Sequence, residues 1–398
     1  MIKPTAKFQI LEGDPSEIEN LAKRRGGIRV SLYLPVSHNP PESEQNPIRL
    51  RALIDEARDR LDASGAGAER AEELLDPVAS LASAPETLLI RGKALALFID
   101  SGSALLLELP YETAPLCRVG DRFAIKALLP LLQWNPTYTA ICINRGNVRA
   151  FRGNRTGIEP VRIPDMPERL EDVTRIDDPE NSLQHHTART ESAKGRPGSA
   201  PSEILHGHGL PSDLEDSQFE RFFREVGKAV HAYLSGRKDT LVLFGVEENV
   251  GLFNSIGDWK ERRVVSKMED PHEWDAGRVR EEAWNLLEPF GRAEITARLD
   301  RLREAENKEH GIFELSECAL AAAMGWIDLV AVAMDREVNG ICDVDKTQVM
   351  IADEDGTARA MDLYDFVASE TIRHGGEAVG LEAAAIPGKE GVAAAVRF

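Results

Sequence analysis

The chain has 398 residues, enough for two or three domains of ordinary size. Hydrophobic residues make up 42% and charged residues 29%, a globular balance that excludes a chain disordered throughout. Its 48 Lys and Arg against 67 Asp and Glu give a formal net charge of −19. Such a surface repels nucleic acid on average, so any RNA contact must be local, and DNA is not expected as a partner.

The four cysteines form no CxxC pair, which argues against a disulfide framework or a cysteine zinc site. Each lies in an apolar run, so Cys117, Cys142, Cys318 and Cys342 are predicted to be core residues. The first residues lack the apolar stretch of a signal peptide, and no run of about 18 apolar residues occurs. The sequence therefore predicts a cytoplasmic protein with no membrane contact.

The first third of the chain predicts an α/β domain over residues 1–135. Ile28–Pro35 alternates apolar with other residues and predicts a strand, followed by a polar, proline-rich loop. Apolar positions at helical spacing predict helices over 48–61 and 68–82. Two strands, Ala94–Ile99 and Ala104–Leu109, are expected to pair through a short turn, and a helix over 123–132 precedes the boundary near Trp134–Pro136.

The middle segment, 136–270, opens with a predicted hairpin of Tyr138–Asn144 and Asn147–Phe151, and Gly157–Ile163 adds a third strand. Residues 164–212 show no convincing periodicity and predict an unusually long loop. A phenylalanine-rich helix follows over Phe219–Leu234, then a buried strand over Thr240–Val246.

Residues 271–398 predict an acidic α/β domain. Helical patterns run from about 271 to 307, with a break expected near Pro289-Phe290-Gly291. Helices over Leu315–Met324 and Leu363–Arg373 alternate with strands, which the sequence indicates over 328–333, 338–342, 349–351 and 392–398.

The negative charge is concentrated in the last third. Residues 1–137 hold 16 basic and 19 acidic side chains, residues 138–268 hold 19 and 20, and residues 269–398 hold 13 and 28. An acidic surface is commonly only a solubilising one. If any part meets a phosphate backbone, we expect it to be the first two thirds, whereas the last third offers a surface for a protein partner.

Standard catalytic signatures are absent from the sequence. It contains no GxGxxG opening a helix after a strand, no GxxxxGK[ST], no GxSxG and no HExxH. Adjacent acidic pairs such as Glu247-Glu248 are common on charged surfaces and do not by themselves indicate paired-carboxylate catalysis. No cofactor and no catalytic residue are predicted.

The long loop carries the one cluster of chemically distinctive residues. Four of the nine histidines fall there, His185, His186, His206 and His208, but their spacing does not preorganise a tetrahedral metal site, so no metal is expected. Cationic Arg189, Lys194 and Arg196 accompany them, and Gly195 and Gly198 allow close approach of the backbone. Such a loop suits contact with RNA phosphates, and a loop without any role is the alternative.

Several segments, in their order along the chain, resemble a known superfamily. They are SLYLP (Ser31–Pro35), NPIRLRALIDEAR (Asn46–Arg58), RFAIKALLPLLQ (Arg122–Gln133), YTAICINRGNVRAFRG (Tyr138–Gly153), DLYDFVASETIRHGGEAVGL (Asp362–Leu381) and AAAVRF (Ala393–Phe398). Together they resemble the bacterial members of the archaeo-eukaryotic class-I release factor superfamily, relatives of pelota and the eukaryotic release factor.

The resemblance implies three domains: a family-variable first domain, an RNase H-like middle domain, and a last domain similar to kink-turn-binding ribosomal proteins that docks proteins. In true release factors a Gly-Gly-Gln loop of the middle domain enters the peptidyl-transferase centre. The equivalent stretch here, 164–212, lacks that triplet. The only Gly-Gly pairs, Gly26-Gly27 and Gly375-Gly376, predict turns at helix ends.

The leading hypothesis is therefore a ribosome-associated factor with ribosome or tRNA as partner, acting in rescue, termination-like or ribosome-protecting steps without peptidyl-tRNA hydrolysis. Two alternatives remain open. One is a hydrolase that uses the histidine-rich loop, and the other is an acidic interaction scaffold that does not contact RNA. The sequence leaves enzymatic activity undecided, although the missing triplet argues against it.

Overall fold

The computed structural model describes residues 8–83, 90, 92–100, 103–144, 146–174, 212–308, 310–352 and 360–397. The chain packs as two compact units. Unit 1 comprises residues 1–135, 155–157 and 288–398, and unit 2 comprises residues 136–154 and 158–287. Both contain sheets and helices, so the predicted α/β class is confirmed. The division into three domains at residues 135 and 270 stays a prediction.

The N-terminal part of unit 1 is a five-stranded sheet in the order β1-β4-β3-β2-β5. Its strands are β1 (Phe8–Leu11), β2 (Arg25–Pro35), β3 (Ala94–Asp100), β4 (Ser103–Leu109) and β5 (Leu116–Arg122). Its helices are α1 (Pro15–Lys23), α2 (Asn46–Ala63), α3 (Ala68–Ser83) and α4 (Leu129–Gln133), with 3₁₀ turns η1 (Glu42–Gln45) and η3 (Lys126–Leu128). The hairpin predicted between β3 and β4 is confirmed by their antiparallel pairing.

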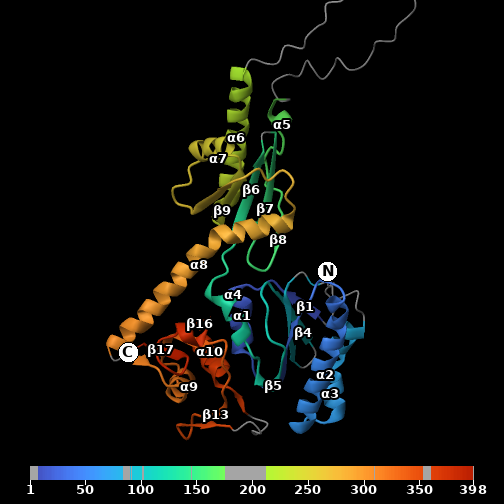
Figure 1. Ribbon diagram of the computed structural model, residues 1–398, viewed down its shortest axis with the longest axis vertical. Helices are drawn as coiled ribbons and strands as arrows, with labels where there is room; N and C mark the ends of the chain where they lie inside the picture. The colour runs from blue at the N-terminus through green and yellow to red at the C-terminus, as the bar shows by residue number, and fades with distance from the viewer. Residues whose placement is uncertain are drawn as a thin grey trace, which may run out of the picture. The chain divides into compact units, whose positions relative to one another are not determined.

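Strand alternation divides this sheet between two hydrophobic cores. In β3, Leu95, Leu97 and Ile99 face the core formed with α2 and α3, which lie side by side along the sheet (Figure 1). Ala96 and Phe98 face the opposite core. Because successive side chains of a strand point to opposite faces, a fully apolar strand such as β3 requires cover on both sides.

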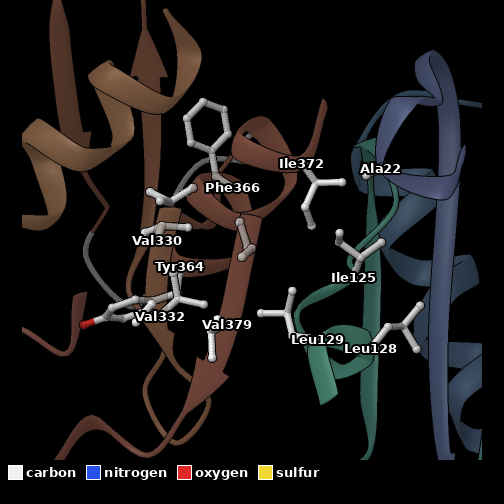
Figure 2. Close-up of a cluster of buried hydrophobic side chains, with 14 of the residues drawn as sticks. Ala22, Ile125, Leu128, Leu129, Val330, Val332, Tyr364, Phe366, Ile372 and Val379 are labelled. Atoms are coloured by element: carbon white, nitrogen blue, oxygen red, sulfur yellow. The ribbon is translucent and has the colours of Figure 1, made fainter. Parts of the chain in front are cut away.

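The core on the second face includes α1 and α4 and continues into the last third of the chain. That third contains α8 (Ala276–Asn307), β11 (Gly311–Ile312), α9 (Leu315–Ala323), β12 (Ile327–Ala333), β13 (Asn339–Asp343), β14 (Gln348–Ile351), β15 (Met361–Asp362), α10 (Leu363–Arg373), β16 (Glu377–Leu381), η5 (Ala383–Ala385) and β17 (Val392–Val396). Its α10 packs on α1, and its β16 packs on α4. Two sheets form, ordered β11-β17-β12-β16 and β14-β13-β15. Figure 2 shows Ile125 and Leu129 on one side of the shared core, with Ile372 and Val379 on the other. The first and last thirds thus form one continuous core.

Unit 2 is built on a sheet in the order β10-β9-β6-β7-β8. The elements are β6 (Tyr138–Asn144), β7 (Asn147–Gly153), β8 (Ile158–Pro160), α5 (Leu170–Thr174), α6 (Ser212–Leu234), β9 (Thr240–Gly245), α7 (Glu247–Ile256) and β10 (Val264–Met268). Phe222 and Phe223 of α6 are buried against Ile141 and Leu243 of the sheet. Phe244 follows Leu243 in β9, so its side chain points to the opposite face of the sheet. There it contacts Trp274 edge-on, with 5.1 Å between the ring centroids.

The structure corrects two expectations about helices. Residues 170–174, inside the predicted loop, form helix α5. The expected break near Pro289 is wrong, because α8 continues through it, with Val279, Ala283 and Leu287 buried before Pro289 and Leu302 buried after it. Packing of both halves outweighs the single backbone hydrogen bond that proline removes.

The cysteine predictions hold for three of the four residues. Cys117, Cys142 and Cys318 are buried, and burial raises the pKa of the Cys117 and Cys142 thiols to about 12. Cys342 is only half-buried, so the prediction is wrong there. In the described parts of the chain no helix is long and apolar enough to cross a membrane.

Candidate functional site

The predicted RNA-contact loop lies outside the described residues. This applies to Arg189, Lys194, Gly195, Arg196 and Gly198, and to the histidines at 185, 186, 206 and 208. Their roles stay predictions. Among the residues that the structure does describe, no group of three or more His, Cys, Asp or Glu side chains is placed to hold a metal ion.

The two described ends that flank the loop lie together on unit 2. Helix α5, which precedes it, contacts α6, which follows it. Helix α5 is also tied to the β6–β7 hairpin, because Leu170 N donates to Gly146 O at 3.3 Å and Arg169 forms a bridge with Asn147. The described helices on either side of residues 175–211 are therefore neighbours.

A buried polar network stabilises the other end of the same sheet, away from the β6–β7 turn. Asp239, 4% exposed, accepts hydrogen bonds from Arg152 Nε at 2.9 Å and Thr139 Oγ1 at 3.0 Å. The Asp239 hydrogen bond raises the pKa of Arg152. Because this carboxylate is saturated by donors and no second acid shares its site, we assign it to anchoring β6, β7 and β9 rather than to catalysis.

Unit 1 contains a second, more unusual polar cluster, in which three arginines surround one carboxylate. Glu370 of α10 is 1% exposed. Arg122 Nη1 donates to its Oε1 at 2.8 Å, and Arg373 donates to its Oε2 through Nε at 2.9 Å and Nη2 at 2.7 Å. Arg25 Nη2 also contacts Oε1. We call Arg25, Arg122, Arg373 and Glu370 the arginine cluster.

The arginine cluster carries excess positive charge. Burial, together with the charges of Arg122 and Arg373 and against that of Asp121, lowers the pKa of Arg25 to about 10. Burial likewise lowers the pKa of His374, with Arg373 contributing. The depressed pKa of Arg25 thus reflects burial first and the neighbouring guanidinium charges second.

The two Gly-Gly pairs of the sequence flank this cluster. Gly375 and Gly376 end α10: Gly375 N donates to Ile372 O and Gly376 N to Thr371 O, the hydrogen bonds of a Schellman motif, as predicted. Gly26 and Gly27 do not end a helix. They lie in β2 at φ +77° and +70°, where its register with β5 shifts between Arg25 and Arg29. Only glycine adopts this conformation without strain, and it places Arg25 opposite Arg122.

A second carboxylate of α10 connects the two parts of unit 1. Asp365 Oδ1 accepts from Ile125 N at 2.7 Å and from Lys126 N at 2.5 Å, at the start of η3. Lys126 Nζ also pairs with Asp362. Burial raises the pKa of Asp365 to about 6, and Asp362 adds to the rise. This carboxylate lies in the contact between the first and last thirds of the chain, so a change in its charge should change the stability of unit 1.

Sequence reasoning missed the arginine cluster, although one signal was present. Each Gly-Gly pair follows a basic pair, giving Arg24-Arg25-Gly26-Gly27 and Arg373-His374-Gly375-Gly376. Nothing in local periodicity indicates that two such segments, near opposite ends of the chain, meet at one glutamate. The pairing is a property of tertiary structure.

Comparison with known families gives one match. Residues 137–325 match the family model described as bacterial archaeo-eukaryotic release factor family 3. The match spans just under half of the chain and covers most of unit 2 and the start of the last third. The resemblance to the bacterial members of that superfamily is thereby confirmed. A comparison with curated proteins gave no match.

Several solved structures are similar over most of the chain, but remotely. The archaeal translation termination factor aRF1 is 12% identical, with 98% of this chain and 99% of that chain covered and a TM-score of 0.23. Pelota of Archaeoglobus fulgidus is 15% identical, with 76% and 79% covered and a TM-score of 0.32. Dom34 of S. cerevisiae, described as a translation termination-like factor that interacts with Hbs1, is 12% identical, with 75% of each chain covered and a TM-score of 0.33. No residue role is transferred from them at these scores.

Proposed function

We propose that this protein is a cytoplasmic, ribosome-associated translation factor of the release-factor-like kind, acting in ribosome rescue, termination-like steps or ribosome protection. The observation that carries the proposal is the family match over residues 137–325. In this proposal unit 2 corresponds to an RNase H-like middle domain, and the acidic last third corresponds to a small α/β domain similar to kink-turn-binding ribosomal proteins.

The proposed contact with ribosome or tRNA is made by the segment between α5 and α6. The two helices that flank it are neighbours, and α6 is fixed on the sheet by a phenylalanine-rich core, which supports a role for the segment between them as a contact carried on a rigid base. Its cations Arg189, Lys194 and Arg196 meet RNA phosphates, while the net charge of the last third disfavours RNA and suits a protein partner.

The proposed role does not include peptidyl-tRNA hydrolysis. The sequence contains no Gly-Gly-Gln, and the triplet's position in the family falls within 164–212. Hydrolysis requires a backbone and side chain that position water at the ester carbonyl, which this segment does not supply by that motif. We expect no release of peptide when the purified protein is added to ribosomes that carry peptidyl-tRNA.

Co-sedimentation with bacterial ribosomes tests the proposal. Between about 50 mM and 200 mM salt, binding should weaken steeply, because phosphate contacts release counterions. In the triple variant Arg189→Ala, Lys194→Ala, Arg196→Ala, binding should weaken, and the slope of log K against log salt should flatten by roughly 2 to 3.

A matched control removes two arginines and one lysine elsewhere: Arg292 and Arg303 on α8 and Lys308 directly after it, which are 73%, 55% and 68% exposed. Each forms an exposed ion pair with a carboxylate three or four residues away, so the control variant should fold normally. If the two variants bind equally well, the loop is not the contact. If the unaltered protein does not sediment with ribosomes at low salt, the scaffold alternative replaces the proposal.

A further inference from the structure

A cleft of about 600 Å³ lies beside the arginine cluster, within unit 1. Three elements supply cations to it: Lys23 at the end of α1, Arg298 of α8 and Arg373 at the end of α10. His374 also lines it, and Leu132 and Ile372 form an apolar part of its wall. A volume of this order accommodates a small metabolite rather than a single ion.

Arg298 is a cation of the cleft with one nitrogen that lacks a hydrogen-bond partner within the described residues. Its Nε donates to Glu377 Oε2 at 2.8 Å. Its Nη1 is buried, forms no hydrogen bond within the described residues, and lies 3.9 Å from Glu294 Oε2. A buried guanidinium nitrogen without an acceptor is costly unless something else supplies one.

The charges around the cleft favour an anion. Lys23, Arg298 and Arg373 line it together with Glu19 and Glu377, and Arg25 lies behind Arg373 on Glu370. This local excess of cations stands out because the last third of the chain, which supplies most of the cleft, is strongly acidic. Burial and Arg373 lower the pKa of His374, which leaves the imidazole neutral near pH 7 and able to donate or accept a hydrogen bond.

We propose that this cleft binds a phosphorylated nucleoside, with Arg298, Arg373 and Lys23 on the phosphate and Leu132 and Ile372 against the sugar or base. In this structure each of these cations also pairs with a carboxylate, Lys23 with Glu19, Arg298 with Glu377 and Arg373 with Glu370, so phosphate meets the donors that these ion pairs leave over. Cations from three separate elements suit a dianionic phosphate better than a carboxylate. The nucleoside is either free or the phosphorylated 5′ end of an RNA strand, since both present the same chemistry. Among the residues that the structure describes, none that lines this cleft belongs to the segment 164–212, to which we assign ribosome contact.

Titration calorimetry of the full-length protein tests this proposal with three probes: ADP, an octauridylate with a 5′ phosphate, and the same octauridylate without it. We expect saturable binding of a phosphorylated probe below about 1 mM. Arg298→Gln should weaken the binding of the phosphorylated probe at least tenfold, because the charged hydrogen bond from the guanidinium to the phosphate is lost. Arg303→Gln, on the same helix but exposed and paired with Asp300, should leave it unchanged.

A variant with the opposite expected sign guards against misfolding as an explanation. Glu377→Gln removes a carboxylate that engages both Arg298 and Arg301, so phosphate binding should strengthen. If Arg298→Gln weakens the binding of ADP, the ligand is a free nucleotide. If it weakens only the binding of the 5′-phosphorylated strand, the ligand is an RNA end. Absence of binding by all probes, or equal effects of Arg298→Gln and Arg303→Gln, overturns the proposal. No ribosomes are present, so the outcome is independent of ribosome binding.

Discussion

Replacing Glu370 by glutamine should lower the stability of unit 1 by about 3–5 kcal/mol, because the substitution leaves three arginines around a buried site without a carboxylate. Glutamine keeps the size of the side chain and one carbonyl acceptor, so the loss reports the charge rather than a cavity. In scanning calorimetry of the full chain, the transition that includes unit 1 should fall by roughly 10 °C.

Glu304→Gln is the matched control for this prediction. Glu304 is 70% exposed and pairs only with Lys308 in its own helix, so its loss should change stability by no more than about 0.5 kcal/mol. A second variant, Arg25→Gln combined with Glu370→Gln, should recover part of the loss, since it removes one of the stranded cations. If Glu370→Gln behaves like Glu304→Gln, the three arginines do not depend on this carboxylate.

The pH dependence of stability should change when Asp365 is replaced by asparagine. Burial, with Asp362 adding to it, raises the pKa of Asp365 to about 6 in the folded chain, against about 3.9 unfolded. The folded state therefore holds this proton more tightly, and the stabilisation is complete below pH 4 and lost as pH rises through 6. The whole effect amounts to about 3 kcal/mol.

Urea denaturation at a series of pH values measures this effect. Relative to Asp365→Asn, the unaltered protein should lose about 3 kcal/mol between pH 4 and pH 7. Asp362 lies beside the same carboxylate and is coupled to it, so the difference between the two curves reports Asp365 together with its effect on Asp362. Parallel curves would show that Asp365 is already ionised at pH 4 and that its two backbone donors outweigh burial.

Much of the fold follows from local pattern. The helix over Leu363–Arg373 and the strand over Tyr138–Asn144 have the predicted bounds, because their apolar residues repeat at the period of a helix or form a continuous buried run. The elements that sequence reasoning missed have weaker patterns. Strand β5 (LCRVGDR) is half charged, and α1 is short and polar on most of its surface.

The site residues divide in the same way. Composition and charge by themselves located the excess acidity in the last third and singled out the cationic, histidine-bearing segment between α5 and α6. They gave no sign that Arg25 and Arg122 would meet Glu370, or that Asp365 would accept from Ile125 and Lys126. These groups lie far apart in sequence, and no periodicity records a contact of that range.

Only the tertiary structure decided that the first and last thirds share one core. An apolar strand such as β3 indicates that both of its faces are covered, but not which segment covers the second face. The choice depends on how well shapes and charges fit across the contact. Leu129 and Val379 belong to its apolar part (Figure 2), and Lys126 and Asp362 form an ion pair in its polar part. Periodicity reports the environment of a residue, whereas packing selects its partners.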